Sequence, residues 1–234
     1  MNTVIYHANC TDGFSASVAA AKALPGDTVF IAGEYDKPLP HVELGSRVYL
    51  LDLSYKAPEM NELIGRSSQL IVLDHHVTAQ RALTSDSLNL REQDILHFDM
   101  TKSGAVLAWE HFFPQTQVPE FFRFVQARDL WTWDAPNAAE YLQWLDTLPM
   151  DRALWSLMID EPEANRAAAI ATGSAMLSKL NSIAESVATR ATEVSVAGVR
   201  GLMVNAPSEL VNEVGALLAA RCGSFGLVWS VAQD

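Results

Sequence analysis

Short apolar runs alternate with amphipathic segments along the first half of the chain. Segments 14–24 and 58–65 have the spacing of helices, and Pro58 stands where a first helical turn tolerates proline. The apolar runs are rich in β-branched and aromatic residues, as buried strands are. They occupy residues 3–6, 28–32, 47–53, 70–73 and 94–98. Because strongly apolar strands separated by helices pair in parallel, we predict an α/β fold with a parallel five-stranded, Rossmann-like sheet, covered by helices on both faces.

Beyond Ser103 the pattern becomes helical. Helices are expected at residues 105–113, 120–127, 138–145 and, in an Ala-rich stretch, from 161 to about 192. The last elements expected are a strand at 199–204, a helix at 208–221 capped by Ser208, and a strand at 225–231. We therefore expect a first domain over residues 1–135, a helical connector over 136–195 and a partial α/β unit over 196–234. So small a unit must be covered by the connector helix or by a second copy of the chain in a homodimer.

Composition narrows the classes of partner. The formal net charge of -12 repels a long phosphate backbone, so we do not expect the chain to bind extended duplex nucleic acid. No apolar run is long enough for a membrane span, and the first residues, MNTVIYHANC, lack the regions of a signal peptide. Cys10 and Cys222 give no disulfide framework. We therefore expect a cytoplasmic protein without a membrane partner.

Acidic and histidine side chains follow three of the predicted strands. They are His7 and Asp12 after the first strand, Asp52 at the end of the third, and Asp74, His75 and His76 after the fourth. Because the carboxyl ends of parallel strands lie at one edge of a sheet, these groups are expected to converge. Carboxylates and imidazoles together suit Mn, Fe, Co or Zn, whereas a mostly oxygen set favours Mg. Two such ions that share a carboxylate can clamp a phosphoryl group and activate a water.

Other polar and aromatic residues have an ordinary structural explanation. The histidines His41, His97 and His111 are expected to be hydrogen-bonded residues at the rim of the fold. An aromatic cluster in the later helices is expected to lie in the core rather than to stack against bases. Its members are Trp131, Trp133, Tyr141 and Trp144.

Several motifs, in order, resemble those of the DHH phosphoesterase superfamily. They read YHANCTDGFSAS, LDLS, LDHH, FDMTKSGAVLAWEHFF and ARDLWTW. That superfamily includes nano-RNA oligoribonucleases, 3'-phosphoadenosine phosphate phosphatases, single-strand exonucleases, cyclic-dinucleotide phosphodiesterases and family II pyrophosphatases. The resemblance covers residues 1 to about 135 and implies that they form a metal-binding catalytic domain.

The resemblance also implies a role for each matching residue. Two divalent ions are expected, manganese first, with magnesium, cobalt, zinc or iron as alternatives. One ion would be held by His7 and Asp52, and the other by Asp12, Asp52, His75 and Asp129, so that Asp52 is shared. The catalytic groups would be His76, which meets the phosphate, and Asp74, which orients a histidine ring; Ser103 would bind substrate with His76. Asp129 owes its place to the resemblance alone.

Two features depart from the superfamily. Where many members carry two aspartates separated by one residue, this chain reads Cys10-Thr11-Asp12. A Cys10 thiolate would shift the metal preference toward Zn or Fe, and a small buried thiol that binds no metal is an equal alternative. Members also carry a C-terminal substrate-binding domain of the DHHA1 type, with a glycine-rich stretch followed by histidine. The stretch NAPSELVNEVGALLA resembles its opening, but the glycine-rich motif does not occur, so a shortened form or a cut chain is expected.

The expected activity is metal-dependent hydrolysis of a phosphodiester or phosphomonoester in small nucleotides or short oligonucleotides. Within catalysis, the alternative is a pyrophosphate hydrolase that uses the same metals. A catalytically weak protein that binds a nucleotide or a partner, as a sensor or an inhibitor, is the alternative from another class. Small substrates are expected to be better than long ones, because no glycine-rich lobe grips an extended chain.

Overall fold

Two compact units make up the computed structural model, which describes residues 1–83 and 86–231. The first unit is Met1–Ile170 and the second is Ala171–Asp234. This division corrects the three parts expected from the sequence. Helices α6 (Ala138–Leu145) and α7 (Arg152–Asp160), which fall in the expected connector, contribute buried apolar residues to the core of the first unit. The boundary between the units lies inside α8 (Arg166–Ala188).

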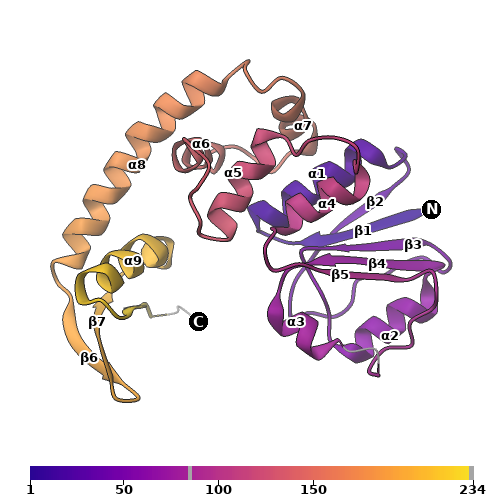
Figure 1. Cartoon of the computed structure of the whole chain (residues 1–234), viewed down its shortest axis with the longest axis horizontal. Helices are drawn as coiled ribbons and strands as arrows, with labels where there is room; N and C mark the ends of the chain where they lie inside the picture. Colours follow the sequence, from indigo (N-terminus) through magenta and orange to yellow (C-terminus); the bar gives the residue numbers. More distant parts are fainter. Residues whose placement is uncertain (84–85, 232–234) are drawn as a thin grey trace. The chain divides into compact units, whose positions relative to one another are not determined.

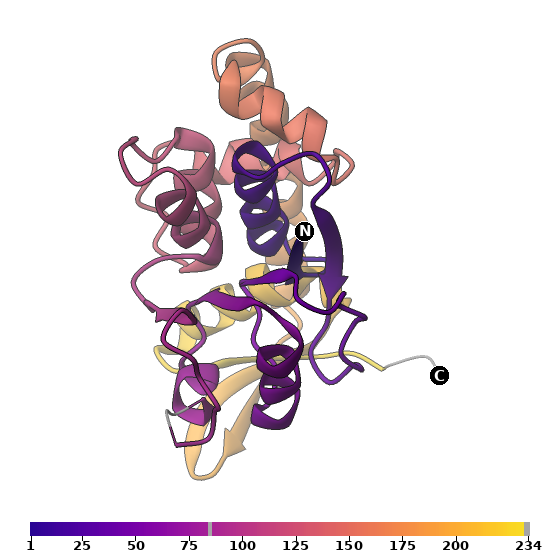
Figure 2. The same ribbon diagram turned by 90° about the vertical axis from the view of Figure 1, so that its right-hand side faces the viewer.

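The first unit contains the parallel five-stranded sheet that the sequence predicted, in the order β2-β1-β3-β4-β5 (Figure 1). Its strands are β1 (Asn2–His7), β2 (Val29–Gly33), β3 (Arg47–Leu51), β4 (Gln69–Asp74) and β5 (Ile95–Phe98). Helices lie on both faces, with α1 and α4 on one side and α2 and α3 on the other (Figures 1 and 2). These helices are α1 (Thr11–Ala23), α2 (Ala57–Arg66), α3 (Val77–Ala82) and α4 (Gly104–Phe112). Helix α3 was not predicted, because its 6 residues are too few to show a helical period.

Alternate residues of the central strands enter two separate cores. Tyr49 and Leu51 of β3 pack with α1 and α4, whereas Val48 and Leu50 pack with α2. Successive side chains of a strand point to opposite faces of the sheet, so each face receives every second residue. None of the four is more than 3% exposed. This burial on both sides explains why the strand reads as a continuous apolar run.

The register of the central strands brings three polar residues to one level. Tyr6 of β1 pairs with Leu51 of β3, and Leu51 pairs with Leu73 of β4. The residues that follow these three are His7, Asp52 and Asp74. The strand order changes direction between β1 and β3, and ligands of open parallel sheets bind at the carboxyl ends of strands beside such a point. The fold therefore places these polar side chains where a ligand site is expected.

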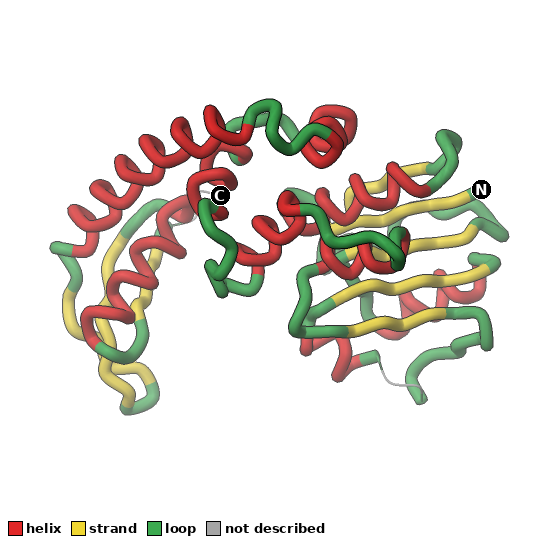
Figure 3. The backbone as a smooth tube through the Cα atoms, turned by 45° about the horizontal axis from the view of Figure 1, so that its top comes forward, coloured by secondary structure: helices red, strands yellow, loops and turns green. Residues whose placement is uncertain are grey.

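The second unit has a small sheet of its own (Figure 3). Its strands are in the order β6-β7-β8. Its elements after α8 are β6 (Thr192–Val196), β7 (Val199–Asn205), the 3-10 turn η1 (Ser208–Leu210), α9 (Val211–Cys222) and β8 (Gly226–Trp229). A two-residue turn at Ala197 and Gly198, both with positive φ, joins β6 to β7. The end of α8 was expected to remain helical to about residue 192, but the helix stops at Ala188 and β6 follows.

The end of α8 covers part of this unit, which was one of the two expected alternatives. Ala184, Val187 and Ala188 are buried with Val204 of β7 and Leu218 of α9. The homodimer stays a prediction. Ser208 does not cap α9, since it lies in η1 and the N-cap residue of α9 is Leu210. None of the helices in the described residues combines the length and the apolar character needed to cross a bilayer.

Candidate metal centre

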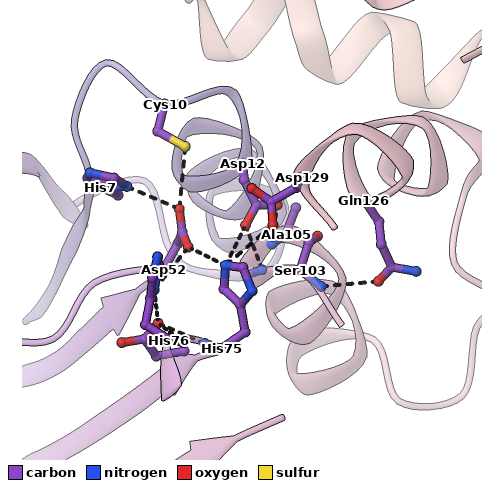
Figure 4. Close-up of polar contacts among 12 residues, drawn as sticks. His7, Cys10, Asp12, Asp52, His75, His76, Ser103, Ala105, Gln126 and Asp129 are labelled. Atoms are coloured by element: carbon purple, nitrogen blue, oxygen red, sulfur yellow. Dashed lines mark hydrogen bonds and ion pairs between the residues drawn. The ribbon is translucent and has the colours of Figure 1, made fainter. Parts of the chain in front are cut away.

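Asp52 lies at the centre of a group of polar side chains at the carboxyl end of the sheet (Figure 4). It follows β3 directly and has a left-handed φ of 57°, which is uncommon for a residue other than glycine. Its backbone N–H donates to the carbonyl oxygen of Leu73 in β4, at 2.9 Å, and its side chain is only 2% exposed. Such strained residues persist where the surrounding structure holds them, and they are concentrated at functional sites.

One oxygen of the Asp52 carboxylate faces a histidine and a cysteine. Oδ2 lies 3.4 Å from Nδ1 of His7 and 3.5 Å from Sγ of Cys10. His7 is the last residue of β1 and Cys10 immediately precedes α1, so the two lie at opposite ends of the short connection between these elements. Gly13, in the first turn of α1, allows the helix to lie close against His7, because a Cβ at this position would be 2.6 Å from the carbonyl oxygen of His7. One ligand atom from each of His7, Cys10 and Asp52 lies within 4.8 Å of the other two, which is a geometry that could hold a metal ion.

The other oxygen of Asp52 faces His75. Nε2 of His75 lies 3.1 Å from Oδ1 of Asp52, 3.4 Å from Oδ2 of Asp129 and 3.8 Å from Oδ2 of Asp12. Asp12 belongs to the first turn of α1, and Asp129 is the last residue of α5 (Glu120–Asp129). Asp12, His75 and Asp129 form a second group whose ligand atoms lie within 4.8 Å of one another. His76 joins Asp52 and His75 in a third such group.

Asp12 also connects the first turn of α1 to the beginning of α4. Its carboxylate accepts hydrogen bonds from the N–H groups of Gly104, at 2.6 Å, and Ala105, at 3.0 Å. These N–H groups have no partner within their own helix. A Cβ at Gly104 would lie 2.5 Å from Cβ of Asp52 and 2.9 Å from Oδ2 of Asp12, so a larger residue would push α4 away from these two side chains. Asp12 therefore has a structural contact in addition to its place beside His75.

Ser103 is a buried helix cap in this structure. Its Oγ accepts a hydrogen bond from the N–H of Val106, and its own N–H donates to Oε1 of Gln126, at 3.1 Å. Its hydroxyl also stabilises the neighbouring Asp12 carboxylate. These contacts give Ser103 a structural role, and its role in substrate binding stays a prediction.

Asp74 orients the two histidines that follow it. Its Oδ1 accepts hydrogen bonds from the N–H groups of His75, at 2.7 Å, and His76, at 3.2 Å, and lies 2.6 Å from Nδ1 of His76. Its Oδ2 accepts a hydrogen bond from the hydroxyl of Ser54, at 2.5 Å. A carboxylate that accepts the Nδ1 proton fixes the ring and its tautomer. Nε2 of His76 is then the ring nitrogen left for a ligand.

The charges of the centre favour a cation between the carboxylates. Among the described residues, Asp12, Asp52 and Asp129 form ion pairs with histidines and with no Lys or Arg. Burial raises the pKa of Asp12, and the charges of Asp52 and Asp129 raise it further. Burial also acts on Asp52, but the neighbouring imidazoles outweigh it and lower the pKa of Asp52 to about 2. Burial opposes the protonation of His75, yet the hydrogen bond to Asp52 and the nearby carboxylates raise its pKa to about 9.

The donor atoms fit divalent metal ions. Nδ1 of His7 is buried, and its 3.4 Å contact with Oδ2 of Asp52 does not have the geometry of a hydrogen bond, so a metal ion would satisfy it. Burial and the charge of Asp52 raise the pKa of Cys10 to about 12, so the thiol would become a thiolate only beside a cation. Imidazole, carboxylate and thiolate are ligands that transition metals accept together.

Tyr35 is a residue of this centre that the sequence did not reveal. Its ring packs edge-on against His7 and His76, with ring centroids 4.9 Å and 5.9 Å apart. Its hydroxyl lies 3.4 Å from Nδ1 of His76. Tyr35 follows β2 in a segment without a periodic pattern, and its only sequence signal is this place beyond a strand that pairs with β1.

The histidines expected at the rim do not take part in the three ligand groups. His41 is exposed and lies 3.2 Å from Oε1 of Glu43. His111 packs edge-on against the ring of Tyr49. Together with His97 in β5, they lie outside the centre formed by the described residues.

Comparison with known proteins gives the fold but no activity. No protein-family model matches the chain. The chain is 29% identical over 182 residues to uncharacterized protein R106 of Acanthamoeba polyphaga mimivirus, a match that covers 71% of this chain and 42% of that protein. The chain thus spans about two fifths of the length of this relative. It is also similar to an uncharacterized protein from Helicobacter pylori G27 of known crystal structure, with a TM-score of 0.51, 10% identity, and coverage of 98% of this chain and 83% of that one. At this identity the likeness supports the α/β fold alone.

Proposed function

We propose that this chain is a metal-dependent phosphoesterase that hydrolyses a phosphodiester or phosphomonoester in a small nucleotide or a short oligonucleotide. The observation that carries the proposal is the position of Asp52, whose two carboxylate oxygens face two different groups of ligand atoms. One carboxylate between two ligand groups is an arrangement that can hold a pair of ions side by side. The ordered motifs that resemble the DHH superfamily support the same activity.

Two divalent ions would be held by the residues of these groups, with manganese as the expected metal. His7 and Asp52 would hold one ion, with Cys10 as a further ligand, and Asp12, Asp52, His75 and Asp129 would hold the other. Bound in pairs, such ions neutralise phosphoryl oxygens and lower the pKa of a water that attacks phosphorus. Asp52 keeps the two groups at a fixed separation, because its buried side chain contacts both.

His76 is the side chain proposed to meet the phosphate. Its Nδ1 is engaged by Asp74, and its side chain is 36% exposed, so it is the most accessible histidine of the triplet. The hydrogen bond with Asp74 raises the pKa of His76, which favours a protonated ring. A fixed and positively charged donor beside a phosphoryl group stabilises the negative charge that develops during hydrolysis.

The proposal is tested by a substrate and metal screen of the purified chain. The substrates are 3'-phosphoadenosine 5'-phosphate, RNA dimers to pentamers, cyclic dinucleotides and pyrophosphate, each with Mn, Mg, Co or Zn. Release of a nucleotide product with manganese, and its loss with a chelator, would support the proposal. Release of phosphate from pyrophosphate alone would replace it with a pyrophosphate hydrolase. Nucleotide binding without turnover under every condition would leave a binding protein and exclude the esterase.

A further inference from the structure

Two tryptophans beyond α5 are exposed, although the sequence favoured the core for them. Trp131 is 49% exposed and Trp133 is 37% exposed, whereas Tyr141 of the same predicted cluster is buried at 7%. The two indole rings lie edge to face, with centroids 5.2 Å apart and an interplanar angle of 72°. Stacking against another flat aromatic group needs accessible ring surface, and both indoles have it.

The segment that carries the pair is held in an unusual conformation. Trp131 and Trp133 both have left-handed backbones, with φ of 57° and 50°, which bulky residues rarely adopt. The N–H of Trp131 donates to the carbonyl oxygen of Arg128, and that of Trp133 donates to the carbonyl oxygen of Ala127. The hydroxyl of Thr132 donates to Oδ1 of Asp134, at 2.9 Å. Strain of this kind, kept by surrounding hydrogen bonds at an exposed position, is typical of functional segments.

The pair lies close to the metal centre along the chain. Asp129, whose carboxylate lies beside His75, is separated from Trp131 by a single residue. Consecutive Cα atoms are about 3.8 Å apart, so the Cα atoms of Asp129 and Trp131 are within about 7.6 Å of each other. At this backbone separation, a nucleotide with its phosphate at the centre is long enough to place its base at this segment.

Attraction by a basic surface is not available to hold such a ligand. The chain has a formal net charge of -12, and the nearby guanidinium of Arg128 already binds Asp146 and Thr11, each at 2.7 Å. Base stacking on aromatic side chains contributes affinity without a positive charge, and every nucleobase has a face that can stack. The exposed indoles of Trp131 and Trp133, which follow Asp129 in the chain, are therefore suited to stack against the base of a nucleotide.

We infer that Trp131 and Trp133 form a stacking platform for the nucleobase of a nucleotide whose phosphate lies at the metal centre. This inference rests on the proposed function and adds the recognised group: the substrate carries a base, and the base, as well as the phosphate, is bound. It also predicts that phosphate compounds without a base are poor ligands.

Calorimetric binding of two probes to the manganese-loaded full chain tests the inference. AMP and ribose 5-phosphate carry the same phosphate, and only AMP carries a base. Stacking one base typically gives about 5- to 150-fold in affinity, and we expect the unsubstituted chain to prefer AMP by a factor in this range. In Trp131→Leu and in Trp133→Leu, the affinities for AMP and for ribose 5-phosphate are expected to become similar. Trp229→Leu is the matched control, because Trp229 is 46% exposed in the second unit, and it should leave the preference unchanged.

The outcomes separate the inference from the proposed function. Equal binding of AMP and ribose 5-phosphate by the unsubstituted chain would overturn the platform and leave the metal-dependent esterase intact. A preference for AMP that survives both substitutions would also overturn it. Failure of both probes to bind with manganese present would count against the metal centre itself, and with it the platform. Thermal unfolding of each variant, and the milder Trp131→Phe and Trp133→Phe, distinguish loss of stacking from loss of the fold.

Discussion

Two aspartates with buried side chains, at opposite ends of the same sheet, are neutralised in different ways. Asp94 precedes β5, at the amino end of the sheet, and Asp52 follows β3, at the carboxyl end. The carboxylate of Asp94 accepts hydrogen bonds from the guanidinium of Arg91 and from the backbone N–H groups of Arg91 and Leu70, all at 2.8 or 2.9 Å. The carboxylate of Asp52 has no Lys or Arg partner among the described residues and faces imidazoles, a thiol and other carboxylates.

The difference indicates which of the two carboxylates has a purely structural role. Arg91 is always charged, so Asp94 is satisfied by the chain at any ordinary pH. Asp52 has imidazoles as its partners, and its charge, with that of Asp129, raises the pKa of the neighbouring Asp12. A buried carboxylate that the chain leaves to titratable partners is a candidate for binding a cation.

The substitution with the largest expected effect is Asp52→Asn. It removes the charge shared by the ligand sets proposed for the two ions, so we expect loss of both ions and of hydrolysis. Metal content of the purified variant, measured after dialysis against manganese, checks this outcome. Asp99→Asn is the matched control, since Asp99 follows β5 at the same edge of the sheet and its carboxylate contacts Thr101 and Lys102 rather than the ligand groups. Unchanged metal stoichiometry in Asp52→Asn would show that Asp52 does not bridge.

The two adjacent histidines are expected to have different roles at the metal centre, His75 in metal binding and His76 in turnover. His75 touches three carboxylates, so His75→Ala should weaken metal binding by at least about 10- to 100-fold. Nδ1 of His76 is held by Asp74, so His76→Ala should keep its metal and lose roughly 10²-fold or more in turnover, as expected for one charge-stabilising donor. Metal titration and initial rates on both variants check the division. Equal loss of metal in both would contradict it.

Cys10 tests whether the first ligand group takes a softer ion than the second. If Cys10 binds the metal, the cobalt-loaded chain should show a thiolate-to-cobalt charge-transfer band in the ultraviolet, and Cys10→Ser should lose it while keeping the second ion. Cys222→Ser is the control, because Cys222 is the other cysteine and is exposed. Cobalt binding without this band would identify Cys10 as a small buried thiol.

The parallel sheet and most of the centre could be predicted from the sequence because their signals are local. Each apolar run marks a strand, and the polar residue at its end is carried to the common edge, as for Asp52 and His75. Tyr35 and the exposure of Trp131 could not be predicted, because a loop conformation has no period. The packing of α6 and α7 on the first unit, and the use of Asp12 to hold α4, depend on contacts between distant segments. Such contacts leave no pattern in the chain.

Asp94→Asn has the smallest expected effect on the metal centre, and it tests the comparison from the other side. The carboxylate of Asp94 is inaccessible, and although its burial raises the pKa, the hydrogen bonds of Arg91 and Leu70 lower it below the usual value. A lowered folded-state pKa gives stability that is present above the unfolded pKa, about 3.9, and is lost as the pH falls through the folded pKa.

Asp94→Asn leaves Arg91 without its carboxylate, so we expect the free energy of unfolding at pH 7 to fall by roughly 2–3 kcal/mol. The difference from the parent chain should shrink as the pH falls below about 4, because the unfolded parent chain then takes up a proton at Asp94 while the folded chain keeps its charge until a lower pH. Denaturant unfolding at pH 7 and pH 3.5 measures both quantities, and metal analysis should give the parent's stoichiometry. A variant that loses metal as Asp52→Asn does would show that the two ends of the sheet are coupled, and that Asp94 is not a purely structural carboxylate.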